Sequence, residues 1–396
     1  MESISGDEAM RFFHLSDLHI GKQLHHYNLR EDQEHILEEV IAYSKELRPD
    51  AIVIAGDIYD KSVPSGEAVT IFDEFLTKLS LIQPKIPVLM IAGNHDSSQR
   101  LDYASRILGA QQIYIEGNAP ATPEDHIRCV TLEDVDGPVH FYLLPFLKPG
   151  YVRGVFDGVL PESYEAAIKQ LLERENICWD ERNVLVTHQF YAGKGQVAET
   201  CDSEVTSVGG LDQIDSAILQ SFDYVALGHL HGAQRAGADH VRYCGTLLKY
   251  SVSEMCQKKS LHVITLGAKG TTIQVKQYPL HPLRDVRQIR GELAELLATA
   301  KAEGREDYVS VTLTDEVDPY RPKEQLEQVY SHILEVRVDN KRTRQILAEM
   351  NLDQSFSDPM TIFAEFYREI QGKELSEEER TMMERVMEQE KGAEER

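Results

Sequence analysis

The sequence is poor in cysteine, in positive charge and in long apolar runs. Its five cysteines are scattered without a CxxC pair, which excludes a disulfide framework and a structural zinc site of the thiolate type. No apolar stretch is long enough to cross a bilayer, so we expect no membrane segment. Residues 1–9 carry acids where a signal peptide carries bases, so we expect no export by that route. Together with the scattered cysteines, this predicts a reduced, cytoplasmic chain.

Positive charge is scarce throughout the chain. Lysine and arginine total 41 against 66 aspartates and glutamates, which gives a formal net charge of -25. Such an acidic protein holds nucleic acid poorly through bulk electrostatics. Any contact with nucleic acid must therefore be local, assisted by metal ions, or shared with a partner.

The first half of the chain alternates short apolar strands with helical periodicity. Strands are expected at 11–15, 51–55 and 87–91, with amphipathic helices at 30–47 and 66–80 between them. This βαβαβ order predicts a parallel sheet between helices. Later segments are strand-rich, so we expect an α/β fold in which two sheets pack face to face with helices outside.

The sequence changes character along its length, and its 396 residues suit two or three domains. We expect the main domain over residues 10–280. Residues 281–339 predict a small separate α/β unit, with helices at 292–304 and 322–333. Residues 340–396 are typical of helices only.

This C-terminal tail carries two apolar stripes at helical spacing. A capping box, Ser376 with Glu379, precedes the second stripe. The tail either docks back on its own domain or grips a partner, and its methionine-rich second stripe favours the partner. The first stripe comprises Met360, Phe363, Phe366, Tyr367 and Ile370, and the second comprises Met382, Met383, Val386 and Met387.

Polar clusters follow five of the expected strands at their C-terminal ends. Taken alone, a cluster such as "GNHD" is typical of a turn. Open α/β sheets, however, bind ligands beyond the carboxyl ends of their strands, so these clusters are expected to converge on one cleft. They contain Asp17 and His19; Asp57 and Asp60; Asn94, His95 and Asp96; His188; and His229 and His231.

The residue types favour a metal centre. Carboxylate, imidazole and amide ligands without cysteine suit Mn²⁺, Fe or Zn. Seven ligands exceed one ion but fit two ions roughly 3.5–4 Å apart that share a carboxylate. We expect Asp57 to bridge the two.

The ordered motifs DxH, GDxxD, GNHD, H and GHxH resemble those of the calcineurin-like metallophosphoesterase superfamily. The stretches "FFHLSDLHIGK", "LREDQEHIL", "GTLLKYSVSE", "QKKS" and "PLRDVRQIRGEL" are similar to the SbcD family, the nuclease subunits of SbcCD complexes that process DNA ends. Lys61 stands where the superfamily's serine/threonine phosphatases have an arginine, which disfavours a protein phosphatase.

The resemblance implies a two-sheet αββα metallophosphoesterase sandwich with a small α/β capping domain and a helical tail. It also implies two divalent metal ions, with Mn²⁺ expected. His95 would act on the scissile phosphate, and Asp60 or Asp96 would orient it. One ion would be held by Asp17, His19, Asp57 and His231, and the other by Asp57, Asn94, His188 and His229.

Function and partners follow from the same resemblance. We expect a Mn²⁺-dependent DNA nuclease, with exonuclease and single-strand endonuclease activity, that works with an SbcC-type coiled-coil ATPase in DNA repair, recombination and replication. A homodimer through helices near 66–80 and 97–108, within a heterotetramer, is also implied. Two alternatives stay open: a phosphoesterase for small nucleotides or phosphomonoesters, and a scaffold that has lost catalysis, which the intact ligand set disfavours.

Overall fold

The computed structural model describes residues 9–204, 213–300 and 304–344, together with separate residues between 360 and 383. By contacts within the chain it divides into two compact units. The first unit consists of Met1–Ile289, Ala300–Val311 and Leu326–Glu335, and the second of Arg290–Thr299, Thr312–Gln325 and Val336–Arg396.

One six-stranded sheet has the order β16-β15-β1-β4-β5-β6. β1, β4, β5 and β6 run parallel, and β15 joins β1 antiparallel, so the expected βαβαβ unit is confirmed. The strands are β1 (Met10–Leu15), β4 (Ala51–Ala55), β5 (Val88–Ile91), β6 (Ile113–Glu116), β15 (Ser260–Leu266) and β16 (Gln274–Pro279), with helices α1 (Arg30–Leu47), α2 (Gly66–Ser80), α3 (Ser98–Leu101) and α4 (Ser105–Gly109) and the short pair β2 (Gln23–Leu24) and β3 (Tyr27–Asn28).

A second six-stranded sheet has the order β13-β14-β12-β9-β8-β7. Its central strands β8, β9, β12 and β14 are parallel. The strands are β7 (Arg128–Asp134), β8 (Gly137–Leu144), β9 (Arg182–His188), β12 (Tyr224–Gly228), β13 (Gln234–Arg235) and β14 (Val241–Tyr243), accompanied by α5 (Tyr164–Arg174), β10 (Tyr191–Ala192), β11 (Ile214–Asp215) and the 3₁₀ helices η1 (Pro149–Phe156), η2 (Ser216–Leu219) and η3 (Val252–Glu254).

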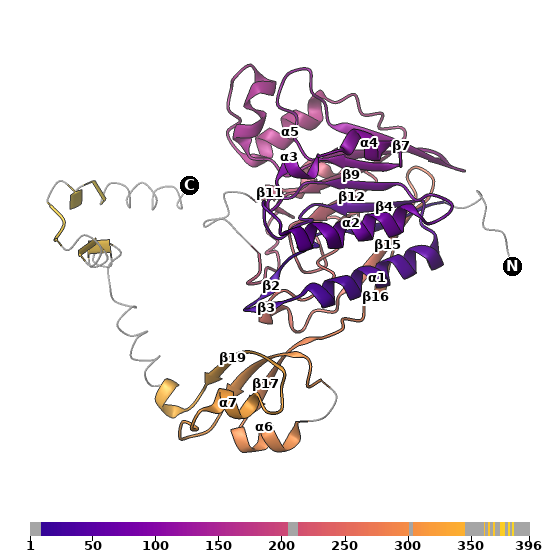
Figure 1. Cartoon of the computed structure of the whole chain (residues 1–396). Helices are drawn as coiled ribbons and strands as arrows, with labels where there is room; N and C mark the ends of the chain where they lie inside the picture. The colour runs from indigo at the N-terminus through magenta and orange to yellow at the C-terminus, as the bar shows by residue number, and fades with distance from the viewer. Residues whose placement is uncertain are drawn as a thin grey trace. The chain divides into compact units, whose positions relative to one another are not determined.

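The apolar pattern of β4 explains why the sheets stack. Every residue of its sequence AIVIA is buried, as expected for a strand covered on both faces. Ile52 and Ile54 join the core beneath α1 and α2, whereas Val53 and Ala55 join the core shared with the second sheet. Figure 1 shows α1 and α2 side by side along the first sheet. The two-sheet α/β sandwich expected from the sequence is confirmed.

A separate three-stranded sheet has the order β17-β18-β19, formed by β17 (Val286–Gly291), β18 (Tyr308–Leu313) and β19 (His332–Val338). α6 (Leu293–Thr299) lies within the expected helix, of which residues 301–303 lie outside the described residues. The helix expected at 322–333 is wrong beyond α7 (Pro322–Leu326). Residues 327–329 form a turn instead, and the last two residues of the expected helix, His332 and Ile333, pair as the start of β19.

The capping box of the tail is confirmed. Ser376 Oγ and the backbone N–H of Ser376 both donate to Glu379, at 2.8 and 2.9 Å, and the N–H of Glu379 donates back to Ser376 Oγ at 3.3 Å. In the first stripe, the rings of Phe363 and Tyr367 lie 6.2 Å apart. The other expected stripe members Phe366, Ile370, Val386 and Met387 lie outside the described residues. Within the described part of the chain, no helix is both long and apolar enough to traverse a bilayer.

Candidate metal centre

The five polar clusters meet at the carboxyl ends of the parallel strands. They follow β1, β4 and β5 in the first sheet and β9 and β12 in the second, and β4 contacts both β9 and β12. Four of the seven candidate ligands have a left-handed backbone, which non-glycine residues adopt at a cost. These four are Asp17 (φ 52°), His19 (φ 43°), Asp57 (φ 50°) and His229 (φ 104°). Such strain concentrates at functional sites, where it fixes the direction of side chains.

One group of ligand atoms gathers around His19. Its Nε2 lies 3.1 Å from Nε2 of His231 and 3.7 Å from Oδ2 of Asp57. Asp17, His19 and His231 together offer atoms within 4.8 Å of one another. All these side chains are buried, so their ligand atoms face one another and not solvent.

A second group gathers around Asn94. Its Oδ1 lies 3.0 Å from both Nε2 of His188 and Nδ1 of His229. Nε2 of His188 is also 3.4 Å from Oδ2 of Asp57, and its Nδ1 donates to the carbonyl of Ala55 at 2.7 Å. The bond to Ala55 places the proton on Nδ1 and turns the other nitrogen toward the cluster.

Asp57 lies between the two groups. The same atom, Oδ2, faces His19 on one side and His188 on the other, which is the arrangement of a bridging carboxylate. Gly56 (φ 91°) and Gly93 leave room for it: a Cβ on Gly93 would lie 2.1 Å from Oδ1 of Asp57. Neither position accepts a side chain without displacing a candidate ligand.

Charge in the cluster is unbalanced. Burial alone would raise the pKa of Asp57, but His188 and His19 hold it well below its ordinary value. Burial lowers the pKa of His188, yet Asp57 and Asp17 raise it to about 9. Burial and the neighbouring His188 lower the pKa of His229 to about 3. The buried carboxylates thus favour positive charge in the site, which a bound metal ion would supply while leaving the imidazoles neutral.

The donor set fits divalent metal ions. Ligand atoms about 2.1 Å from one ion and at right angles to each other lie roughly 3.0 Å apart. The separations of 3.1 Å between His19 and His231, and of 3.0 Å from Asn94 to His188 and His229, match this spacing. Oxygen and imidazole donors without a thiolate suit Mn²⁺, Fe or Zn. The seven side chains therefore offer two adjoining cation sites that share Asp57.

His95 lies at the edge of the cluster, half-buried. Its backbone N–H donates to Oδ1 of Asp57 at 2.8 Å, and its Nδ1 donates to the backbone carbonyl of Asp60 at 2.8 Å. Its ring meets that of His19 edge-on at 4.8 Å. Since Nδ1 carries the bonded proton, Nε2 is the nitrogen available to a substrate.

The two carboxylates expected to orient His95 act elsewhere in the site. Asp60 accepts from Lys22 at 2.9 Å and lies 3.6 Å from Nδ1 of His19, so its carboxylate supports His19 and only its carbonyl holds His95. Asp96 accepts three backbone N–H groups, from Gly93 (2.9 Å), Ile58 (3.0 Å) and Tyr59 (2.9 Å). Burial and the charge of Asp57 raise the pKa of Asp96 to about 6. Asp96 thus ties the loops after β4 and β5 together.

Sequence reasoning missed a buried chain of polar groups behind His231. Ser203 Oγ lies 2.7 Å from Nδ1 of His231 and donates to Oε1 of Glu254 at 2.6 Å. Lys259 donates to Oε2 of Glu254 at 2.7 Å and to the carbonyl of His231 at 3.0 Å. Burial would raise the pKa of Glu254, but His231 and Lys259 hold it well below its usual range. Glu254 and Lys259 belong to the stretches "GTLLKYSVSE" and "QKKS", which was the available signal.

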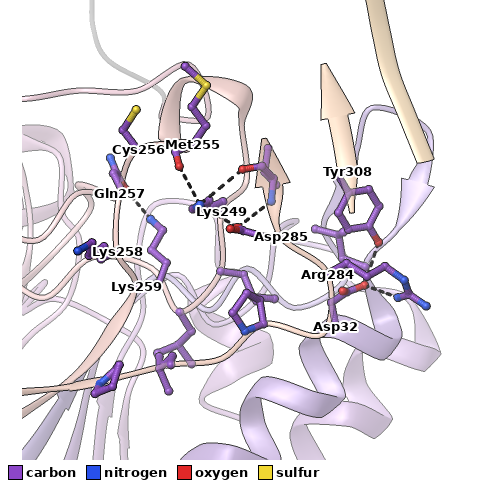
Figure 2. A pocket seen from close by; sticks show the side chains of 17 residues that line it. Asp32, Lys249, Met255, Cys256, Gln257, Lys258, Lys259, Arg284, Asp285 and Tyr308 are labelled. Atoms are coloured by element: carbon purple, nitrogen blue, oxygen red, sulfur yellow. Dashed lines mark hydrogen bonds and ion pairs between the residues drawn. The ribbon is translucent and has the colours of Figure 1, made fainter. Parts of the chain in front are cut away.

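Lys259 also lines a separate pocket of about 400 Å³, shown in Figure 2. There Lys249 bonds the carbonyl of Met255 and the carboxylate of Asp285, each at 2.8 Å. Arg284 and Tyr308 both donate to Oδ2 of the buried Asp32, each at 2.9 Å. Through Lys259 and Glu254 this pocket is connected to the back of His231.

Comparison with known families agrees with this geometry. The family model for calcineurin-like phosphoesterases matches residues 10–233, more than half of the chain. The model described as the type 5 capsule protein repressor C-terminal domain matches residues 282–371. The fold and the cluster thus define a metallophosphoesterase.

Comparison with individual proteins narrows the class. The chain is 31% identical over 377 residues to the SbcD-type subunit of the SbcCD nuclease of Staphylococcus epidermidis, covering 93% of this chain and 95% of that protein. The chain therefore belongs to the SbcD family.

Two solved structures are similar at low identity. A dimetal phosphatase from Danio rerio is 14% identical, with a TM-score of 0.42, covering 68% of this chain and 96% of that one. GAP50, the anchor in the inner membrane complex of Plasmodium, is 13% identical, with a TM-score of 0.40, covering 69% and 90%.

Proposed function

We propose that the chain is the DNA nuclease subunit of an SbcCD-type complex and hydrolyses phosphodiester bonds with two divalent metal ions. We propose Mn²⁺ as these ions. The single observation that carries the proposal is the cluster around Asp57, where two groups of ligand atoms share one carboxylate oxygen. Family membership supports DNA as the substrate. Activity as an exonuclease and as a single-strand endonuclease is part of the proposal.

The proposed chemistry needs little from the protein besides positioning. Divalent ions at such a site polarise the phosphate and lower the pKa of the attacking water. The seven side chains hold the ions, and the strained backbone at Asp17, His19 and Asp57 fixes where they point. His95 contributes an imidazolium that keeps its Nδ1 proton on the Asp60 carbonyl and gives its Nε2 proton to the leaving oxygen, a general-acid role that is worth about 10²–10⁴ in rate.

The acidic surface of the chain argues for a partner. With a formal net charge of -25, the chain attracts DNA only where metal ions and local lysines offset its own charge. We propose that an SbcC-type coiled-coil ATPase supplies most of the DNA-binding surface, that the tail beyond residue 340 binds it, and that residues 281–339 help to select DNA shape. A homodimer within a heterotetramer and a role in end processing, repair and recombination complete the proposal. All five cysteines are free thiols, which suits action in the cytoplasm.

The test is a comparison of substrates. Purified chain with Mn²⁺ is given linear duplex DNA, circular single-stranded DNA, p-nitrophenyl phosphate and cyclic nucleotides, alone and with the ATPase partner and ATP. The proposal predicts cleavage of both DNAs that requires Mn²⁺, with the duplex reaction strengthened by the partner. Hydrolysis of the small esters without cleavage of DNA would contradict the DNA substrate and leave a small-molecule phosphoesterase.

A further inference from the structure

A pocket of about 310 Å³ opens beside the second group of ligand atoms. Asn94 and His229 form part of its wall, so its contents lie against the candidate metal centre. The size lies at the lower end of the range for small-molecule sites, about 300–1,000 Å³. His95 follows the lining residue Asn94 in the chain, and its ring packs against that of His19 in the first group. A phosphodiester bound at the cluster could therefore reach both His95 and this pocket.

Four aromatic side chains line the pocket, together with polar residues that include Asp96, Ser98 and Gln189. Phe146, Tyr151, Tyr164 and Phe190 all border the pocket. The ring of Phe190 lies 6.2 Å from that of His229, and the ring of Phe146 lies 6.5 Å from that of His188. Aromatic rings next to a phosphodiester-cleaving centre provide stacking faces for a nucleobase, and such stacking tolerates any base.

One cation completes the site. Lys148 lines the pocket, is exposed, and forms no ion pair or side-chain hydrogen bond within the described part of the chain. The backbone around Lys148 is held by hydrogen bonds: Gln189 donates to the carbonyl of Leu147 at 2.8 Å, and the N–H of Tyr151 donates to the carbonyl of Lys148 at 2.8 Å. Lys148 is thus held beside the rings, where it can pair with a backbone phosphate.

We propose that this pocket binds one unpaired nucleotide of the DNA strand next to the scissile phosphate, with its base against the aromatic rings and a flanking phosphate at Lys148. The inference rests on the proposed nuclease function and adds a substrate preference to it. A base in the pocket must leave the helical stack, which costs least at single strands and frayed ends. The chain without its partner therefore prefers unpaired DNA.

A binding experiment tests the pocket without catalysis. A short single-stranded oligonucleotide carrying 2-aminopurine is added to the full chain with Mn²⁺, in the slowly cleaving His95→Ala background. Stacking on the rings is expected to quench the fluorescence. Tyr151→Ala should weaken binding about 5- to 100-fold, and Tyr151→Phe should restore it. Tyr151 is 56% exposed, so its truncation leaves the core intact. Leu160→Ala, an exposed apolar change outside the lining, is the matched control.

A cleavage experiment separates this proposal from the proposed function. A single strand with an abasic nucleotide at the cleavage position keeps the phosphodiester and removes the base, so it reports on the metal centre without the pocket. Tyr151→Ala should lower kcat/KM for a normal single strand about tenfold, the wild type should show the same loss on the abasic strand, and the two changes together should cause no further loss.

Two outcomes overturn the pocket assignment. One is equal binding and cleavage of abasic and normal strands. The other is that Tyr151→Ala and the wild type bind and cleave a normal single strand equally well. Failure to hydrolyse any phosphodiester, with quenching and its loss in Tyr151→Ala intact, would refute the proposed function and keep the nucleotide pocket.

Discussion

Substituting Glu254 by glutamine removes a single charge from the buried chain behind His231. Glu254 is fully buried and accepts five hydrogen bonds, from Ser203, Tyr250, Ser251, Lys259 and Thr246. Loss of one partner of a buried ion pair costs about 3–5 kcal/mol, because Lys259 keeps its charge without a counter-ion. Loss of the hydrogen-bonded support of a metal-binding histidine lowers metal affinity about 10- to 100-fold. Glu254→Gln is therefore expected to reduce both stability and metal affinity.

Two assays check this prediction together. Urea unfolding of metal-free protein gives the free energy of unfolding, and titration with Mn²⁺ gives the affinity. Glu181→Gln is the control, because Glu181 is a partly exposed carboxylate that bonds His140 at 2.7 Å. This change should alter the free energy of unfolding and the Mn²⁺ affinity only slightly. The double variant with Lys259→Met should recover part of the stability, since no unpaired charge remains. A loss below about 1 kcal/mol with unchanged Mn²⁺ affinity would refute the reasoning.

Three further predictions follow from the site and the core. Gly56→Ala should lower DNA cleavage about 100-fold, because the added Cβ would come 2.4 Å from Nδ1 of His188 at φ 91°; cleavage rates near wild type would contradict this. Addition of EDTA should lower the free energy of unfolding, and Mn²⁺ at 100 times the dissociation constant of each site should restore about 2.7 kcal/mol per site; equal stability with and without metal would contradict a folded-state site. The pKa of His262 is lowered to about 4 by burial and by Arg242, against 6.5 when unfolded. Between these pH values the unfolded chain binds one more proton than the folded chain, so the contribution of His262 to stability is full above pH 6.5 and falls by roughly 3 kcal/mol toward pH 4. Urea titrations at several pH values should show a smaller loss of stability in His262→Gln than in the wild type. An equal loss in both proteins would exclude this contribution of His262.

The regular elements could be predicted where burial follows a simple period. α1 begins and ends at residues 30 and 47 as expected, because its apolar residues recur at helical spacing. β4 was predicted from its short, continuous apolar run. The helix expected at 322–333 stops at Leu326 because Ile333 suits a helical face and a strand equally and pairs in β19, so the chain turns over 327–329 before that strand.

The metal centre, too, could be predicted only in part. Strand order predicted that the five polar clusters converge, because each follows a strand whose direction is set by the fold. The choice of seven ligands among them came from the family resemblance. The support of His231 could not be predicted, since Ser203 and Glu254 lie 51 residues apart and no strand ends at either. The resemblance also implied that a carboxylate orients His95, whereas the backbone carbonyl of Asp60 accepts its Nδ1–H.

The central claim is that seven side chains hold two divalent ions and that His95 acts on the phosphate without holding either. The most direct test measures metal content and cleavage of single-stranded DNA in the same samples of wild type and His95→Ala. We predict two Mn²⁺ ions per chain in both proteins and a loss of about 100-fold or more in cleavage by the variant. Equal cleavage by the two proteins, or loss of metal from His95→Ala, would contradict the claim.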